Sequence, residues 1–142
     1  MKALIDTCII IDALQSRRPF CVDAEKIFLA TASFQCESCI TAKEVTDIYY
    51  LTHHATHSIE TTKDIISKLL SLFNMIDTTA GDITQALVSS MTDYEDAVMT
   101  ESAIRMSMDC IVTRNLDDYK NAPCPVYSPD EFLKKIDYQN PL

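Results

Sequence analysis

The chain has 142 residues, which suits one domain of common size and is too short for two ordinary hydrophobic cores. Its 12 lysine and arginine residues stand against 21 aspartate and glutamate residues, and the resulting formal charge of −9 argues against nucleic-acid binding through a broad basic face. The single glycine, Gly81, excludes glycine-rich phosphate loops and dinucleotide-binding fingerprints.

The N-terminal part of the chain predicts short apolar strands, each followed by a helix. Residues 3–5 favour a buried strand and residues 7–14 a helix. A second helix is expected over about residues 22–34, where apolar side chains recur on one face. The segment CESCIT, residues 36–41, favours a strand, and the AKEVTDIYYLTHH segment that follows it favours a helix over 42–54.

The same alternation continues to the C-terminus. In chain order we expect a helix at 59–73, a strand at 74–77, helices at 83–91 and 95–106, strands at 110–113 and 125–127, and a closing helix at 129–136. Strands that alternate with helices are typical of a parallel sheet covered on both faces. The sequence therefore predicts an α/β fold, a three-layer α/β/α arrangement with a central parallel sheet, as a single domain over residues 1–142.

Acidic and amide side chains gather where the predicted strands end. Asp6 is the first of them, and it lies between two apolar runs in the segment ALIDTCIII, where a buried carboxylate needs a partner or a cation. Ligand sites of open parallel sheets lie at the carboxyl ends of the strands. The other side chains at such positions are Glu44, Glu95, Asp96, Asn115, Asp117 and Asp118.

Helical spacing predicts that two of these acids face inward. Glu44 shares a helix face with Ile48 and Leu51, and Asp96 leads Met99 and Ala103. Carboxylates that are brought together repel one another unless a cation lies among them, and hard oxygen ligands select Mg²⁺ or Mn²⁺. We therefore expect an acidic pocket that binds a divalent metal.

Each acid also has a plainer explanation when it is taken alone. Asp6 can be the N-cap of the helix that follows it. Glu95 and Asp96 can complement a helix N-terminus, and Asp117 and Asp118 can be ordinary turn residues. The coincidence of all of them at strand ends is what favours a shared site.

The acidic segments, in this order, resemble the PIN-domain family, a metal-dependent nuclease fold that includes the VapC-type toxins of bacterial toxin–antitoxin pairs. The opening LIDTCIIIDAL resembles the family's first motif with Asp6 as its acid, and TAKEVTDIYYL places Glu44 at the second. DYEDAVMTESA is similar to the third motif, with Asp96, and CIVTRNLDDY followed by VYSPDEFL is similar to the fourth motif and tail. The resemblance covers nearly the whole chain.

The fourth motif departs from the family pattern. Many members have an aspartate directly after Thr-Arg, where this chain has Asn115. An amide oxygen can ligate a metal but brings no charge. We therefore expect Asp118 to take over this role, with Asp117 as the other candidate, while Asp47 lies one turn beyond Glu44 and can share its task.

The resemblance implies an endoribonuclease that hydrolyses RNA phosphodiester bonds with the help of Mg²⁺ or Mn²⁺. It implies catalytic roles for Asp6, Glu44, Asp96 and Asp118, and metal ligation by Asp6, Asp96, Asp118 and Asn115. Local phosphate contacts are available from Arg17, Arg18, Arg105, Arg114 and Lys120, although a solvated surface role is the commoner one for such residues. Toxin-like members also pair as homodimers and are silenced by a small antitoxin protein.

The cysteines and the apolar segments bear on location. No signal peptide is apparent, so we expect Cys8, Cys21, Cys36, Cys39, Cys110 and Cys124 to be reduced thiols of a cytoplasmic protein. No apolar run approaches the roughly 20 residues needed to span a bilayer. A zinc site of Cys36, Cys39, His53 and His57 lacks compact ligand spacing.

Two other function classes compete with the nuclease. A non-catalytic PIN-fold module that binds RNA or protein is the stronger alternative, because Asn115 weakens the set of charges. A phosphoryl-receiver signalling domain is the weaker one. Asp6 has no adjacent acid, and Asp77 is the only aspartate in a position to accept the phosphoryl group. The sequence favours packing or a dimer surface, rather than base stacking, for Tyr49, Tyr50 and Leu51.

Overall fold

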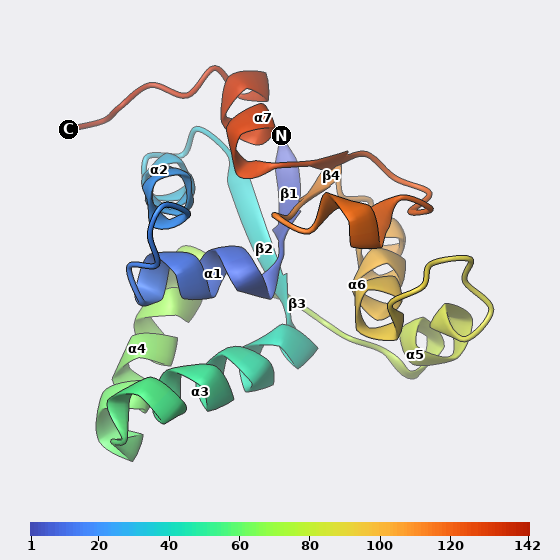
Figure 1. The fold of residues 1–142 in the computed structure, drawn as a ribbon, viewed down its shortest axis with the longest axis horizontal. Helices are drawn as coiled ribbons and strands as arrows, with labels where there is room; N and C mark the ends of the chain where they lie inside the picture. Colours follow the sequence, from blue (N-terminus) through green and yellow to red (C-terminus); the bar gives the residue numbers. More distant parts are fainter.

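A computed structural model that describes residues 1–142 shows one sheet of five parallel strands (Figure 1). The strands are β1 (Lys2–Ile5), β2 (Glu37–Thr41), β3 (Asn74–Ile76), β4 (Cys110–Val112) and β5 (Val126–Tyr127). Their order across the sheet is β3-β2-β1-β4-β5. The chain thus builds outward from β1 to one edge and then returns to build β4 and β5 on the other side of β1. The change of direction lies between β1 and β4.

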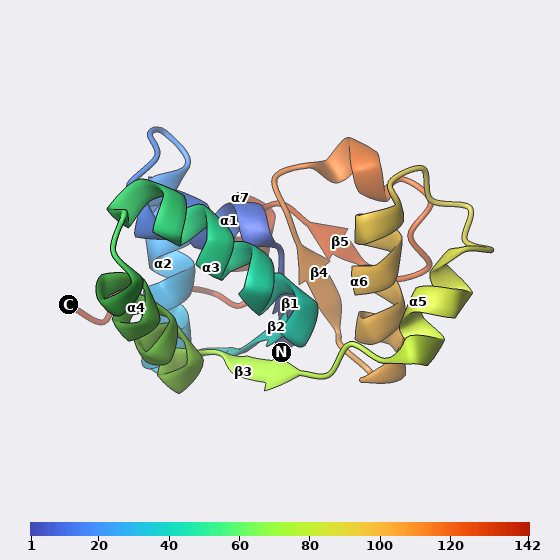
Figure 2. The ribbon, with the colours of Figure 1, turned by 90° about the horizontal axis from the view of Figure 1, so that it is seen from below.

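Helices cover both faces of this sheet. They are α1 (Thr7–Leu14), α2 (Cys21–Ala32), α3 (Ala42–Thr56), α4 (Ile59–Leu72), α5 (Ala80–Ala86), α6 (Tyr94–Arg105) and α7 (Pro129–Lys135), with a short 3₁₀ helix η1 (Leu116–Tyr119). Figure 2 shows α1 to α4 on one side of the strands and α5 and α6 on the other. The predicted three-layer α/β/α fold is confirmed. None of the helices combines the length and apolarity needed to cross a bilayer.

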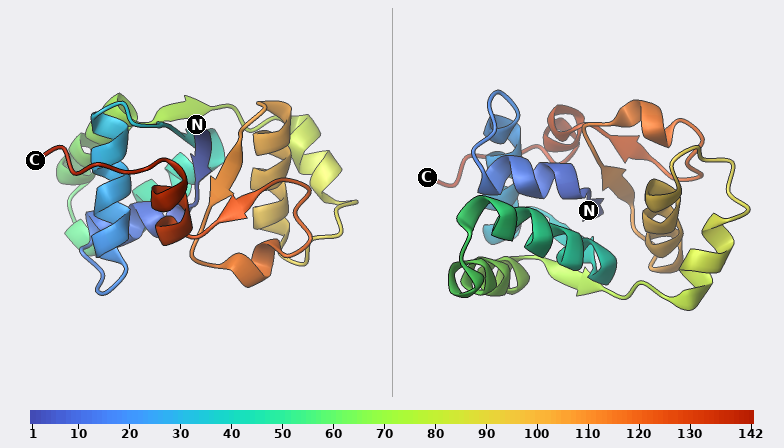
Figure 3. Two further views of the ribbon diagram at one scale, coloured as in Figure 1. Left: turned by 90° about the horizontal axis from the view of Figure 1, so that it is seen from above. Right: turned by 60° about the horizontal axis from the view of Figure 1, so that its bottom comes forward.

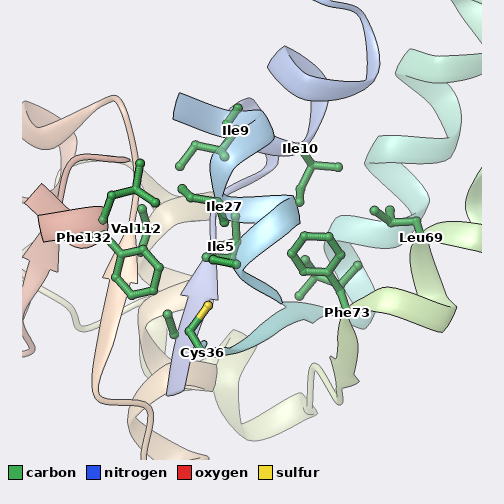
Figure 4. Packing of buried hydrophobic residues seen from close by; sticks show 14 of the residues in the cluster. Ile5, Ile9, Ile10, Ile27, Cys36, Leu69, Phe73, Val112 and Phe132 are labelled. Atoms are coloured by element: carbon green, nitrogen blue, oxygen red, sulfur yellow. The ribbon is translucent and has the colours of Figure 1, made fainter. Parts of the chain in front are cut away.

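Alternation along the strands produces two cores. Ala3 and Ile5 of β1 face the helices α1, α2, α3, α4 and α7, and Leu4 faces α5 and α6. Figure 4 shows Ile5 in the larger core, between Phe132 of α7 on one side and Phe73, at the end of α4, on the other. Burial of such side chains, each worth about 1.5–3 kcal/mol, holds the helical layers against the sheet.

The last helix ties the C-terminal segment to the N-terminal half. Figure 3 shows α7 beside α2, and the two helices are in contact. Beyond α7, the backbone N–H of Gln139 donates to Oε1 of Gln35, and Nε2 of Gln35 donates back to the carbonyl of Gln139. The smaller core on the other face contains residues of α5 and α6 together with Tyr119 of η1.

Most element boundaries agree with the sequence prediction, but the helix expected at 83–91 is wrong. The helix α5 begins at Ala80 and ends at Ala86. Thr79 is its N-cap: the Thr79 hydroxyl accepts from the Asp82 N–H, and the Asp82 carboxylate accepts from the Thr79 N–H. This capping box fixes the start three residues early, and the helix ends at Ala86, before the predicted end at Met91. The helix η1 was not predicted.

A buried ion pair joins α5 to α6. Asp82 accepts from Nε and Nη2 of Arg105, at 3.0 Å each, and from the Ser102 hydroxyl at 2.8 Å. Although burial alone would raise the pKa of Asp82, the Arg105 guanidinium and the N–H of Thr79 hold it at about 2. Because the folded-state pKa lies below the usual value, the ion pair stabilises the protein above about pH 4 and loses its effect as the pH falls toward 2.

We predict that Asp82→Asn lowers the free energy of unfolding at pH 7 by about 1–2 kcal/mol. The value is modest because the Arg105 side chain is 34% exposed and solvent screens the pair. Urea unfolding of both proteins between pH 7 and pH 2 checks this. The difference should shrink as the pH falls through the window from 4 to 2, and a difference that does not depend on pH would contradict the charge-based explanation.

Candidate functional site

The change in strand direction places Asp6 and Thr113 side by side at the carboxyl edge of the sheet. Asp6 follows β1 and Thr113 follows β4, and the backbone N–H of Asp6 donates to the carbonyl of Val112 at 2.9 Å. The Thr113 hydroxyl donates to Oδ2 of Asp6 at 2.6 Å. Ligands of doubly wound sheets bind at this kind of position.

Asp6 is not the helix cap that its position permits. It precedes α1, but its side chain makes no capping hydrogen bond; its Oδ2 accepts from Thr113 and from the thiol of Cys8. The residue is only 7% exposed. Burial raises its pKa, and the hydrogen bonds from Thr113 and Cys8 offset part of this. Asp6 is therefore a buried carboxylate held in place by donors.

Glu44 is buried beside it, as predicted. Thr41 at the end of β2 caps α3, and in this capping box Oε1 of Glu44 accepts from the Thr41 N–H at 2.9 Å. Its other oxygen, Oε2, accepts from the Thr7 hydroxyl at 3.1 Å. Burial, with a contribution from the charge of Asp6, raises the pKa of Glu44 to about 8. One predicted neighbour on the inward face is wrong: Leu51 is 41% exposed.

Asp96 reaches the same edge from the opposite helical layer. The helix α6 leads into β4, so its first turn lies at the carboxyl ends of the strands, and Asp93 is its N-cap. Oδ1 of Asp96 accepts from the Tyr119 hydroxyl at 3.2 Å. Burial raises the pKa of Asp96 to about 7, and the charges of Asp6, Asp93 and Asp118 contribute to the rise. The predicted inward neighbours Met99 and Ala103 are buried.

One cleft of about 340 Å³ brings together three of the four acids that were assigned catalytic roles, and Asp47 and Glu95 line it as well. Asp6, Glu44 and Asp96 line it, and Lys43 and Tyr50 of α3 line its rim. The carboxylates come from elements at residues 2–7, 37–56 and 94–105, so only the fold assembles them. Their mutual effects on pKa show that they act on one another electrostatically. The site is thus a pocket of repelling carboxylates.

The fourth predicted position lies on an exposed turn beside this cleft. Asn115, Asp117 and Asp118 are exposed, and together with Arg114 they line an adjoining depression. The charge of Asp118 nevertheless raises the pKa of Asp96. Of the candidates for this position, Asp118 is the one whose charge raises the pKa of a cleft acid, the half-buried Asp96.

A sequence model of one protein family, described as PIN domain, matches residues 2–117, which include β1 to β4 and all of the cleft acids. The chain belongs to the PIN domain family. The predicted resemblance to this family is confirmed. The fold brings the acidic motifs, which are far apart in the sequence, to one edge of the sheet. A comparison with curated proteins gave no match.

Solved structures of toxin–antitoxin proteins share this PIN fold. VapBC2 from Rickettsia felis, bound to a DNA fragment from its promoter, superimposes with a TM-score of 0.66 at 16% identity and covers 90% of this chain and 98% of its own. A toxin–antitoxin complex from Klebsiella pneumoniae gives a TM-score of 0.65 at 22% identity, and the match covers 89% of this chain and 97% of that one. VapC20 from Mycobacterium tuberculosis, described as a Sarcin-Ricin loop cleaving toxin, gives 0.60 at 13%, covering 77% and 86%.

The donor set of this PIN domain suits a hard divalent cation. No three His, Cys, Asp or Glu side chains are placed as a ready-made metal site. The cleft nevertheless holds the carboxylates of Asp6 and Asp96, whose pKa values are raised chiefly by burial. Hard oxygen donors of this kind suit Mg²⁺ or Mn²⁺. The residues present therefore fit the expected group.

Several side chains that support the site could not be read from the sequence. The hydroxyls of Thr113 and Tyr119 hold Asp6 and Asp96 in place. Lys43 bridges the cleft, with its Nζ 2.6 Å from Asp47 and 3.5 Å from Glu95. A lysine next to Glu44 is a weak signal, because only the packing of α3 against the neighbouring layer shows that it faces the cleft.

Two of the basic residues expected to contact phosphate have other partners. Arg105 binds Asp82, and Arg114 binds Asp12 through Nε at 2.6 Å while it lies over the ring of Phe20. Both guanidinium groups therefore hold elements together.

The two alternative sites are not assembled by the fold. Cys36 packs in the larger core and Cys39 in the smaller one, on opposite faces of the sheet. Asp77, the acceptor that a receiver domain would need, follows the edge strand β3, and its backbone carbonyl accepts from Arg105. Neither set of residues shares the cleft of Asp6 and Asp96.

Proposed function

We propose that this PIN domain is a divalent-metal-dependent endoribonuclease that hydrolyses RNA phosphodiester bonds and serves as the toxin of a toxin–antitoxin pair. The observation that carries the proposal is the convergence of Asp6, Glu44 and Asp96 in one cleft, each with a raised pKa. Lys43, the basic residue of the lining, pairs with Asp47 and Glu95 rather than with these three acids. Such a cleft repels a phosphate unless divalent ions are bound. Bound divalent ions would thus allow this acidic protein to bind a polyanionic substrate.

Asp6, Asp96 and Asp118, with the amide oxygen of Asn115, are the residues proposed to hold Mg²⁺ or Mn²⁺. The ion supplies positive charge for the scissile phosphate and lowers the pKa of an attacking water. Asp118 is preferred to Asp117 at the fourth position because its charge acts on Asp96. The exposed turn around η1 leaves Asp118 and Asn115 free to face a ligand.

The remaining contacts position these groups. Thr113 orients Asp6 and Tyr119 orients Asp96, each through its hydroxyl. Glu44 assists: its oxygens accept from Thr41 and Thr7, so it anchors the first turn of α3 beside Asp6. Carboxylates that are pre-oriented in this way lose little conformational freedom when a metal and a phosphate bind.

We further propose that residues 1–142 act as one domain in the cytoplasm, as a homodimer silenced by a small antitoxin protein. The solved structures of similar fold from Rickettsia felis and Klebsiella pneumoniae support the antitoxin, since they contain toxin–antitoxin proteins. All six cysteines are free thiols, which suits a reducing compartment. An antitoxin that blocks an acidic cleft needs a basic side chain. We therefore expect the antitoxin segment that enters the cleft to be basic.

A non-catalytic PIN module that binds RNA or protein remains the second candidate. The observation that favours it is Asn115, which replaces a charged ligand with a neutral one on the exposed turn. The two proposals differ in a single property, which is whether bound RNA is cut.

The direct test is cleavage of a single-stranded RNA mixture by the purified chain. We expect fragments in Mn²⁺ or Mg²⁺, a fall to the background rate with excess chelator, and recovery when the metal is restored, because the acids cannot approach phosphate without the cation. Gel electrophoresis of end-labelled RNA measures this. RNA that binds in the presence of metal and remains intact would reject the nuclease in favour of the non-catalytic module.

A further inference from the structure

One wall of the cleft carries an exposed aromatic ring that the proposed chemistry does not use. Lys43, Asp47 and Tyr50 recur at spacings of four and three on α3, so they form one stripe, and all three line the cleft. Tyr50 is 75% exposed. This exposure is incompatible with core packing, one of the two roles that the sequence favours for it; the other is a dimer surface.

Tyr50 has no partner that explains its position. Its neighbour Tyr49 lies parallel to His53, with ring centroids 6.2 Å apart, but Tyr50 belongs to none of the aromatic pairs of the structure. A tyrosine in this position keeps a free ring face at the entrance to the cleft. Seven residues separate it from Lys43, which corresponds to about 10 Å along the helix.

We propose that Tyr50 stacks on an unpaired nucleobase of the substrate next to the scissile phosphate. The inference rests on the proposed nuclease function and adds a residue that positions the substrate and shapes specificity. A base inside a duplex already has stacking partners on both faces, so Tyr50 selects RNA that is single-stranded at this point. Aromatic stacking needs no positive charge on the protein, which suits this acidic chain.

The lining of the cleft favours RNA over a protein partner as the occupant. Only three of the ten lining residues are hydrophobic, and the charged side chains include Asp47 and Glu95 beside Tyr50. The centre of a protein interface is depleted in charge, whereas a site for single-stranded nucleic acid combines aromatic platforms with positive charge along the backbone. In this acidic cleft, bound divalent cations would supply that positive charge. Continuity with Asp6 and Asp96 brings a stacked base close to the phosphate that these acids address.

The test compares Tyr50→Ala and Tyr50→Phe with wild type on short single-stranded RNA in Mn²⁺. We expect Tyr50→Ala to raise KM about tenfold with little change in kcat, because stacking strengthens binding rather than the chemical step. Tyr50→Phe retains the ring and should retain KM. The matched control is Phe34→Ala, which removes a ring that is 93% exposed at the opposite end of the sheet.

A second arm uses RNA with one abasic nucleotide beside the mapped cleavage site. The KM of wild type should rise about tenfold on this RNA, as the KM of Tyr50→Ala does on intact RNA. The KM of Tyr50→Ala should rise no further on the abasic RNA, because both changes remove the same stacking contact. If the effects of the abasic nucleotide and of Tyr50→Ala on KM multiply, the inference is overturned. An unchanged KM for Tyr50→Ala on intact RNA would overturn it as well.

The two proposals fail in different ways. If wild type cuts no RNA, the nuclease proposal fails, and fluorescence anisotropy of labelled RNA on wild type and Tyr50→Ala in Mn²⁺ still measures the stacking contribution. If Tyr50→Ala changes the oligomeric state by light scattering and leaves RNA affinity unchanged, the ring belongs to a protein interface and the stacking inference is rejected.

Discussion

Asp96→Asn should lower kcat for metal-dependent RNA cleavage by at least about 100-fold, while the metal-free variant unfolds at a temperature no lower than wild type. The loss follows from removing one charged ligand from the proposed metal site, since a bound divalent ion would supply several kcal/mol of transition-state stabilisation. The preserved stability follows from the repulsion in the cleft. Burial and the charges of Asp6, Asp93 and Asp118 all oppose ionisation of Asp96, so a neutral amide relieves the folded state.

Thermal unfolding with and without Mn²⁺ separates these two effects. Wild type should gain stability with rising metal concentration, and Asp96→Asn should lose most of this gain, as should Asp6→Asn. Glu101→Gln is the matched control, since it removes a carboxylate from the same helix α6 outside the cleft. Its activity and its response to metal should remain those of wild type. Cleavage at the wild-type rate by Asp96→Asn would show that this carboxylate does not hold the ion.

The fold was predictable because its strands and helix starts are encoded locally. The apolar strands around Leu4 and Ile111 lie next to polar residues, and a capping threonine such as Thr41 marks where α3 begins. The error at α5 came from weighing the apolar residues at 83–91 above the capping box of Thr79 and Asp82. Apolar spacing gives the type of an element better than its ends, because caps decide the ends.

The acids of the site were predictable for a different reason. A carboxylate at the end of a buried strand, such as Asp6, stands out against the apolar residues around it, and the parallel sheet dictates that strand ends meet. Their supports were not predictable, since Thr113 and Tyr119 are ordinary residues in sequence. Their importance arises from contacts across 107 and 23 residues, and only the folded chain shows these.

Asp12, like Asp6, is a buried carboxylate next to apolar residues, but its partner is an arginine side chain. It lies within the apolar run IIIDAL of α1 and is completely buried, yet it does not face the cleft. Its two oxygens accept from Nε and Nη2 of Arg114, at 2.6 and 3.2 Å, across 102 residues of sequence. Because Arg114 directly follows Thr113, this ion pair also fixes the segment that orients Asp6.

Arg114→Met should therefore lower the free energy of unfolding by about 3–5 kcal/mol, since it leaves the carboxylate of Asp12 buried without a partner. For a domain of this size the expected fall in Tm is about 10 °C. Lys134→Met is the matched control: it removes an exposed i,i+4 partner of Asp130, and a change below about 1 kcal/mol is expected. Urea unfolding at pH 7 measures both variants.

The double variant Asp12→Leu with Arg114→Met distinguishes a charge effect from a packing effect. If the cost of Arg114→Met is the stranded carboxylate, replacing Asp12 as well should restore most of the lost stability, because an apolar pair of similar volume carries no desolvation penalty. If the two losses instead add, the guanidinium acts through its contact with Phe20, whose ring centroid lies 3.9 Å from it. Restored stability with weakened RNA cleavage would show that the ion pair aligns Thr113 with Asp6 as well as stabilising the fold.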